Sequence, residues 1–339
     1  MKPVLIFGGG AVGMALAVHL VNSGREVRLV RTSGADGFET NLEVSVEDFG
    51  TSYTANVPCL PIKELKKTKG LLVVTAKAFA NAEISKAILR SRSIGSVILL
   101  QNGLAVERPF IEAGFQDIYR GVLYVTGERV AANRVSFHAV KPSVIGVVKG
   151  SHDCLQKILS SLTTTPFPFE KTDAIETAVW KKAVVNCAFN SLCPVLDVNN
   201  GVFARDGEAL ALAMEVIGEC LEVAERVGIS LNKATIVDQI LQISSGSNHF
   251  ISTLQDIRNG RPTEIDCLNL EVARIAASLD PEIRVPRTEL LGRLISLKSR
   301  IARQVKCDDP VLSIAPPMNR GTLANESPIL ATQHRNTTF

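Results

Sequence analysis

The first hundred residues alternate between short apolar runs and segments with helical spacing. Val4–Phe7 is a continuous apolar run, typical of a strand buried on both faces, and residues 11–22 then place apolar side chains every three or four positions. Further apolar runs lie at 26–30, 71–76 and 96–100, and further helical patterns at 79–89 and 105–113. Strands that alternate with helices in this way predict a parallel, doubly wound sheet.

The pattern changes after about residue 119. Residues 119–148 form short alternating runs, which predict antiparallel strands that close one edge of the sheet. Residues 163–173 are rich in Thr and Pro and are predicted to link two domains. Beyond them the spacing is helical, most clearly at 208–227, 263–279 and 288–304, which predicts a helical bundle.

Three parts of the chain follow from these patterns. We expect an α/β N-terminal domain with a Rossmann-type doubly wound sheet at residues 1–170 and an all-α C-terminal domain at 171–307. Residues 308–339 lose periodicity and gain Pro, Asn and Thr, so a loosely held tail is predicted there. The length of 339 residues suits about two domains.

Composition excludes several classes of protein. Hydrophobic residues make up 46% and charged residues 21%, which is ordinary for a globular chain. The net charge of +3 is spread without blocks of one sign, so no nucleic-acid partner is predicted, and no apolar stretch reaches the ~18 residues of a membrane span. The seven cysteines show no paired spacing, which argues against a disulfide framework or a metal site and favours the cytoplasm.

Three glycines stand at the turn between the first predicted strand and helix. Gly8, Gly10 and Gly13 have the spacing G-x-G-x-x-G: one allows the tight turn, one lets the backbone approach a pyrophosphate, and one lets the helix pack closely. The helix start at Ala11 and Val12 offers free N–H groups and the positive end of the helix dipole. The sequence therefore predicts a dinucleotide site, with a merely tight turn as the alternative.

The end of the second predicted strand favours NADP over NAD as the cofactor. An NAD site would hold Asp or Glu there for the ribose 2′-hydroxyl, whereas this chain has Arg31 followed by Thr32 and Ser33. A cation beside hydroxyl groups suits a 2′-phosphate. An exposed loop arginine is the alternative interpretation of Arg31.

Polar residues also follow the next two predicted strands. Lys77 comes after the run at 71–76, and Asn102 lies in the segment LLQNG after the run at 96–100. Ligands of doubly wound sheets bind outside the carboxyl ends of the strands, so both side chains are expected in one crevice. The alternatives are a solvated lysine and a turn-forming asparagine.

One predicted helix carries a polar stripe in apolar surroundings. In the segment WKKAVVNCAFN, Lys182, Asn186 and Asn190 recur every four residues and so share one face. Asparagine is a poor choice for a solvated helix face, whereas a cleft with a polar substrate would give these groups hydrogen-bond partners. We therefore favour a binding role over a solvated face.

A further candidate lies in the segment RPTEID. It predicts a helix that starts after Pro262, with Thr263 as the N-cap and Asp266 at the capping-box position. Helix-start chemistry accounts for Asp266. For Glu264 the choice between helix-start chemistry and a functional site stays open.

Together these motifs resemble the ketopantoate reductase (2-dehydropantoate 2-reductase) family. The resemblance covers residues 3–305 and rests on five ordered motifs: GGGAVG, TAK, LLQNG, WKKxxxNxxxN and STLQDIRNGRPTEID. It implies an NADP(H)-binding Rossmann domain, a C-terminal domain like that of 6-phosphogluconate dehydrogenases, and reduction of a 2-keto acid in the cleft between them. The implied reaction converts 2-dehydropantoate to (R)-pantoate, in pantothenate and coenzyme A biosynthesis.

The resemblance also implies roles for single residues. Lys182 corresponds to the catalytic lysine of the family and Glu264 to its active-site glutamate. Substrate contacts are implied for Asn102, Asn186, Asn190 and Ser252, and places near the nicotinamide for Lys77 and Asn102. Elementary chemistry agrees, because hydride addition to a carbonyl leaves an alkoxide that a protonated lysine can neutralise.

Three positions depart from the family pattern. His249 stands where relatives usually carry Asn, Leu270 where many have Gly, and Arg287 where an Asn is expected after Pro. We expect these positions near the substrate side of the cleft. They leave open a different 2-keto or 2-hydroxy acid, and a binding protein that senses NADP without turnover is a further alternative. A homodimer is also left open, because no interface can be told from core in helices this apolar.

Overall fold

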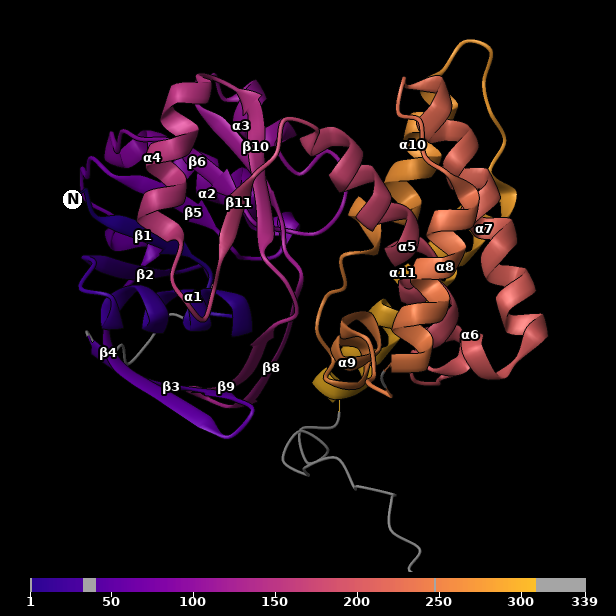
Figure 1. The fold of residues 1–339 in the computed structure, drawn as a ribbon, viewed down its shortest axis with the longest axis horizontal. Coiled ribbons are helices and arrows are strands. Elements are labelled where there is room, and N and C mark those ends of the chain that lie inside the picture. Colours follow the sequence, from indigo (N-terminus) through magenta and orange to yellow (C-terminus); the bar gives the residue numbers. More distant parts are fainter. Residues whose placement is uncertain (1, 33–40, 247, 309–339) are drawn as a thin grey trace, which may run out of the picture.

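The computed structural model describes residues 2–32, 41–246 and 248–308 of the chain. A sheet flanked by helices lies beside a bundle of helices (Figure 1). The predicted fold class, a Rossmann-type α/β domain with an all-α C-terminal domain, is confirmed. The boundary after residue 170 stays a prediction, and the predicted tail lies outside the described residues apart from Asp308, which ends the last helix.

The strands of the described residues form one continuous sheet. In chain order they are β1 (Val4–Phe7), β2 (Val27–Arg31), β3 (Asn41–Asp48), β4 (Thr51–Pro61), β5 (Leu71–Val74), β6 (Val97–Leu99), β7 (Ile118–Val122), β8 (Val125–Ala131), β9 (Arg134–Ala139), β10 (Ser143–Lys149) and β11 (Phe169–Lys171). Their order across the sheet is β11-β10-β7-β6-β5-β1-β2-β4-β3-β9-β8. The strands from β4 to β7 in this order pair in parallel, and the order reverses at β1, where such sheets open a crevice for ligands.

The prediction for residues 119–148 was only partly right. β7 pairs in parallel with β6 and belongs to the centre of the sheet, while β10 closes that edge antiparallel to β7. β8 and β9 form a hairpin at the opposite edge, where β9 pairs with β3. The predicted linker at 163–173 also supplies β11, which pairs with β10. An alternating pattern identifies a strand but not its distant partner, which explains these misplacements.

Helices cover both faces of the sheet. α1 (Ala11–Asn22) and α4 (His152–Leu162) pack on one face, and α2 (Asn81–Ser91) and α3 (Arg108–Glu112) pack on the other. Alternate residues of β1 divide between the two cores, with Ile6 on the α1 side and Phe7 on the α2 side. Burial on both faces explains why the parallel strands are continuous apolar runs.

The second half of the described chain is helical. Its helices are α5 (Ile175–Leu196), α6 (Val202–Arg205), α7 (Gly207–Arg226), α8 (Lys233–Gly246), α9 (Ser252–Arg258), α10 (Asn269–Ser278) and α11 (Pro286–Asp308). α5 runs from the edge of the sheet into the bundle, where α7, α8, α9 and α11 surround it (Figure 1). No helix in the described part combines the length and the apolar character of a membrane span.

The helix predicted to start after Pro262 starts later, so that prediction was wrong. Residues Ile265–Cys267 form a single 3-10 turn, and α10 begins only at Asn269 without a side-chain cap. Thr263 is therefore no N-cap, and Asp266 has no capping-box role. The cause is a tertiary contact. The backbone N–H of Leu104, in the loop after β6, donates a hydrogen bond to the carbonyl oxygen of Cys267, and this contact fixes the turn.

Candidate active site

The glycine turn lies between β1 and α1, at the reversal of the strand order. Gly8 has a φ of +130°, and a Cβ there would lie 2.3 Å from the backbone nitrogen of Ala76. A Cβ on Gly13 would lie 2.0 Å from the carbonyl oxygen of Gly8, whereas a Cβ on Gly10 would meet nothing within 4 Å. Packing therefore requires Gly8 and Gly13, while Gly10 leaves open space before the helix.

The start of α1 fits an anionic group. Gly10 is the N-cap and no side chain caps the helix, so its first N–H groups are not used by a capping residue. Ala11 and Val12 form the first turn and are only partly buried. Backbone N–H groups and the helix dipole attract phosphate at such a position. The residues present therefore fit the pyrophosphate of a dinucleotide.

Arg31 ends β2 beside this turn. A Cβ on Gly9 would lie 3.9 Å from Nε of Arg31, which places the guanidinium next to the glycines. Burial, followed by the charges of Arg31 and Arg261, holds the pKa of Arg129 below its usual value, so positive charges from β2, β8 and the segment after α9 act on one another here. Such a gathering fits a phosphate group. Ser33 lies outside the described residues.

Lys77 follows β5 and connects the sheet to the helical half. Its ammonium forms an ion pair with the buried Asp256 of α9, and it donates a hydrogen bond to the carbonyl oxygen of Pro262 at 2.9 Å. Asp256 also pairs with Arg261 at 3.2 Å. The sequence analysis did not single out Asp256, which is the residue that ties Lys77 across the two halves.

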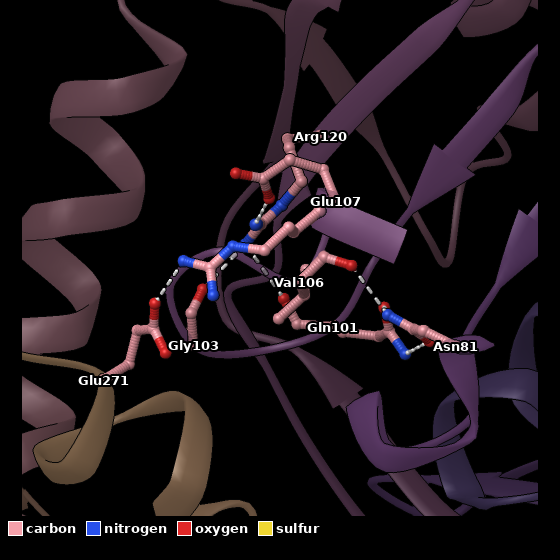
Figure 2. Close-up of polar contacts among 8 residues, drawn as sticks. Asn81, Gln101, Gly103, Val106, Glu107, Arg120 and Glu271 are labelled. Carbon is pink, nitrogen blue, oxygen red and sulfur yellow. Dashed lines mark hydrogen bonds and ion pairs between the residues drawn. The ribbon is translucent and has the colours of Figure 1, made fainter. Parts of the chain in front are cut away.

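Buried amide groups fix the loop that carries Asn102 (Figure 2). Asn81 and Gln101 exchange hydrogen bonds of 3.0 and 2.7 Å between their side chains. Gln101 also donates to the carbonyl oxygen of Ala76 at 2.5 Å, and Asn81 donates to that of Val106 at 2.8 Å. Because both amides are buried, a displaced loop would leave polar groups without partners, which is costly.

Arg120 of β7 holds the same loop from the other side (Figure 2). Its guanidinium pairs with Glu107 at 2.5 Å and donates to the carbonyl oxygens of Gly103 at 2.9 Å and Gln101 at 3.4 Å. The side chain is almost fully buried, and its Nε has no hydrogen-bond partner among the described residues. The sequence analysis missed Arg120, although an arginine inside the strand IYRGV was an available signal.

α5 presents Lys182 to this loop. Its Nζ donates a hydrogen bond to the carbonyl oxygen of Leu123, just beyond β7, at 2.5 Å. Lys182, Asn102 and Arg120 line one narrow cavity, whose other lining residues are Gln101, Gly103, Gly121, Val122, Val179 and Ala183. The structure thus brings Lys182 and Asn102, two residues singled out from separate motifs, into one site.

The ammonium group of Lys182 is buried and largely shielded from water. Burial lowers the pKa of Lys182 to about 8, with the charge of Glu264 acting in the opposite direction and the charge of Arg120 lowering it further. Burial also raises the pKa of Glu264, against the opposing charge of Lys77. Lys182 and Glu264 lie within electrostatic reach of each other, and this lysine loses its proton more readily than an ordinary one.

The other predicted substrate contacts lie deeper along α5 and α9. Asn190 is buried and accepts a hydrogen bond from the hydroxyl of Thr253 at 3.0 Å, and Asn186, one turn earlier, is partly buried. Ser252 is exposed, so its neighbour Thr253 makes the contact with α5. Asn186, Asn190, Ser252 and Glu264 are absent from the described residues that line the Lys182 cavity.

Two of the three departures from the family pattern lie away from this cavity. Arg287 forms ion pairs with Glu215 and Glu219 of α7, and Leu270 packs into a small apolar cluster of the helical half. Neither side chain lines the Lys182 cavity, and a place for these two positions at the substrate side stays a prediction. His249 lies in the segment before α9, and its backbone carbonyl oxygen accepts a hydrogen bond of 3.0 Å from the backbone N–H of Asn200.

These features together suit proton transfer next to a bound nucleotide. A turn that fits an anion follows β1, and the ammonium of Lys182, with its lowered pKa, lies beside the rigid loop after β6. Within the described ranges, no group of three or more His, Cys, Asp or Glu side chains is placed to bind a metal ion.

Two family models match most of the chain. The model of ketopantoate reductase PanE/ApbA matches residues 4–150, and the model of ketopantoate reductase PanE/ApbA C terminal matches residues 174–299. The enzymes of this family are nicotinamide-dependent oxidoreductases that act on CH–OH groups, and the chain is an enzyme of this kind.

The matches to individual relatives cover nearly the full length of each relative. The 2-dehydropantoate 2-reductase of Pyrococcus abyssi (strain GE5 / Orsay) is 26% identical over 308 residues, which cover 88% of this chain and 98% of the relative. The PanE/ApbA family ketopantoate reductase from Ralstonia eutropha JMP134 has a TM-score of 0.77 at 25% identity, with 89% and 99% of the two chains covered. D-mandelate dehydrogenase, solved with NADH and anilino(oxo)acetate, shares the fold with a TM-score of 0.80 at 22% identity and coverage of 88% and 99%.

We predict that Arg120→Met raises the pKa of Lys182. Removal of a neighbouring positive charge favours the protonated lysine, so its pKa should move from about 8 toward the ordinary 10.5. An NMR titration of protein with isotope-labelled lysine measures this pKa. Arg120→Lys, which keeps the charge, should shift it less. Arg90→Met removes an exposed charge of α2, away from the cavity, and should leave it unchanged. An unaltered pKa in Arg120→Met would contradict the coupling.

Proposed function

The chain belongs to the ketopantoate reductase PanE/ApbA family, and we propose that it reduces 2-dehydropantoate to (R)-pantoate with NADPH as the hydride donor. Relatives named 2-dehydropantoate 2-reductase match it at 26% identity over 88% of its length. The observation that carries the proposal is the cavity that Lys182 shares with Asn102. It combines an ammonium of lowered pKa with the carboxyl ends of the parallel strands, where ligands of such sheets bind.

The glycine turn would hold the cofactor. The open space at Gly10 and the N–H groups of Ala11 and Val12 suit a pyrophosphate. Arg31 would bind the 2′-phosphate that distinguishes NADPH from NADH, and the nearby charge of Arg129 supports this choice. When bound, the reduced nicotinamide supplies the hydride that reduces the substrate carbonyl.

Lys182 would act as the general acid. Its ammonium donates a hydrogen bond to the carbonyl oxygen, and transfers a proton to that oxygen as negative charge develops there, which leaves a neutral amine for solvent to reprotonate. With a pKa of about 8, about nine in ten molecules carry this proton at pH 7. The lowered pKa also makes the ammonium a stronger acid than an exposed lysine.

The remaining polar groups would position the lysine, the cofactor and the substrate. Glu264 would hold the ammonium by its charge and accept a hydrogen bond from a substrate hydroxyl. Asn102 would orient the reacting groups from a loop that the buried amides keep rigid. Asn186, Asn190 and Ser252 would contact the substrate further along the cleft, with Lys77 beside the nicotinamide. Positioning of this kind can lower a reaction barrier by several kcal/mol, of order ~7 in favourable cases.

A small anionic substrate agrees with the charges around the cavity. Lys182 and Arg120 both contribute positive charge there, which suits the carboxylate of a 2-keto acid. A different 2-keto acid is the nearest alternative, so tests should include an aryl 2-keto acid, given the shared fold with D-mandelate dehydrogenase. We place the reaction in the cytoplasm on the strength of the unpaired cysteine spacing.

Lys182→Met should remove catalysis and leave cofactor binding intact. Loss of the general acid is expected to lower kcat for ketopantoate reduction by about 10²- to 10⁴-fold, because such groups typically contribute that much. NADPH oxidation measures turnover, and quenching of NADPH fluorescence measures binding. Lys181→Met is the matched control, since it removes the adjacent lysine of the same helix and should keep near-normal rates.

Two results would reject parts of this account. Turnover by Lys182→Met at the rate of the unmodified enzyme would exclude Lys182 as the acid. NADPH binding without oxidation, across ketopantoate and a panel of other 2-keto acids, would favour a protein that senses NADP.

Arg31→Ala should weaken NADPH selectively. A charge-assisted contact to the 2′-phosphate contributes about 1.5–3 kcal/mol, so the KM for NADPH should rise roughly 10- to 100-fold while that for NADH stays nearly constant. Steady-state kinetics with both cofactors measures the difference. Arg28→Ala, which removes an exposed arginine earlier on β2, is the control. Equal effects of Arg31→Ala on the two cofactors would refute the assignment.

A further inference from the structure

The β8–β9 hairpin passes over the start of α1. A Cβ on Gly127 of β8 would lie 3.5 Å from the Cβ of Ala11, in the first turn of α1, so this face of the strand is turned toward the glycine turn. Side chains two residues apart leave a strand on the same face. Arg129, two residues after Gly127, therefore extends from the face of β8 that borders the proposed dinucleotide site.

Arg129 has no acidic partner within the described part of the chain. Its guanidinium donates hydrogen bonds to backbone carbonyl oxygens of its own hairpin, those of Ala131 at 3.2 Å and of Ala132. Arg31, at the end of β2, approaches the same glycine turn. Burial and then the charges of Arg31 and Arg261 lower the pKa of Arg129, because each nearby positive charge disfavours a protonated guanidinium.

Arg261 brings a third positive charge, from the helical half. It follows α9, and its guanidinium pairs with Asp256 at 3.2 Å. Asp256 pairs with Lys77 as well, and Lys77 follows Ala76, whose backbone packs against Gly8. This chain of contacts holds Arg261 near the glycine turn. One carboxylate cannot neutralise two cations, so positive charge remains there.

The position of these arginines identifies the anion that suits them. A cluster of like charges costs free energy, which a bound anion offsets. The end of β2 is where a doubly wound sheet meets the 2′ group of the adenosine ribose, and a phosphate monoester carries about −1.5 to −2 charge at pH 7. The pyrophosphate has its own donors, the N–H groups at the start of α1.

We propose that Arg129 and Arg261 complete the 2′-phosphate site that Arg31 begins, so that both halves of the chain bind NADPH. The assignment rests on the NADPH choice of the proposed function and is independent of which keto acid is reduced. NADH has no charged group at this position, so the two arginines add little to its affinity. The helical half thereby contributes to the choice between the two cofactors.

Cofactor binding without any keto acid tests this site. NADPH and NADH differ only in the 2′-phosphate, and isothermal titration calorimetry of the full-length protein measures the Kd of each. Arg129→Ala and Arg261→Ala should each raise the Kd for NADPH roughly tenfold and leave the Kd for NADH nearly unchanged, because a charge-assisted contact to phosphate is lost. Both side chains are exposed, so the fold should persist, which circular dichroism checks.

Matched controls come from the same two parts of the chain. Arg134→Ala removes an exposed arginine of β9 that pairs with Glu47, and Arg258→Ala removes an exposed arginine of α9 that pairs with Asp197. Both should leave the Kd for NADPH nearly unchanged. Arg129→Lys and Arg261→Lys keep the charge, so they should retain more affinity for NADPH than the alanine variants.

Several results would overturn the assignment. A Kd for NADPH that stays unchanged in either alanine variant would exclude that arginine from the site. Equal weakening of NADPH and NADH would place the arginines at a part common to both cofactors. In either case, selective loss of NADPH affinity in Arg31→Ala would leave the cofactor choice standing. Unmodified protein that binds NADH as tightly as NADPH would reject that choice together with this site.

Discussion

The lowered pKa of Lys182 depends on a cavity in which water cannot fully surround its ammonium group. Taking a charge out of water is costly unless other groups compensate, and here the carbonyl oxygen of Leu123 and the charge of Glu264 do so. The compensation is incomplete because Arg120 adds a second positive charge, so the pKa of Lys182 remains low. The cavity therefore exists only where α5, the end of β7 and the loop after β6 come together.

Contacts across the two halves of the chain keep those elements together. Lys77 pairs with Asp256, Arg108 pairs with the buried Glu271 at 2.6 Å, and the backbone of Leu104 donates to Cys267 at 2.7 Å. The Leu104 contact belongs to the loop after β6, which also carries Asn102, and Arg108 starts α3 directly after that loop. The same loop is anchored in the sheet by the buried amides and by Arg120 (Figure 2). The loop therefore fixes how the sheet and the helical half are placed relative to each other.

Local patterns were enough to predict much of this arrangement. Continuous apolar runs identified the parallel strands β1, β2, β5 and β6 because these strands are buried on both faces. The glycine spacing identified the turn because Gly8 and Gly13 leave no room for a side chain. The polar stripe on α5 was visible because that helix is otherwise apolar. Lys182 and Asn102 could be nominated separately in this way, but no pattern showed that they line one cavity.

The features that sequence analysis missed depend on contacts between distant residues. Arg120 gains its role from a loop that precedes it by about seventeen residues, and Asp256 gains its role from Lys77, far earlier in the chain. The start of α10 was misplaced because the β6 loop holds the preceding turn, which overrides local capping signals. The partners of β8 and β9 were likewise set by the strand hairpin β3–β4, which the sequence analysis did not identify.

The pH dependence of kcat/KM for ketopantoate, measured with saturating NADPH, tests the central role of Lys182 most directly. This ratio reports the ionisation of groups in the enzyme before the keto acid binds. Since the protonated lysine is the active form, kcat/KM should be level at neutral pH, and should fall about tenfold per pH unit once the pH rises above the pKa of about 8. A profile that stays level to pH 10 would contradict a proton-donating lysine held in this desolvated cavity.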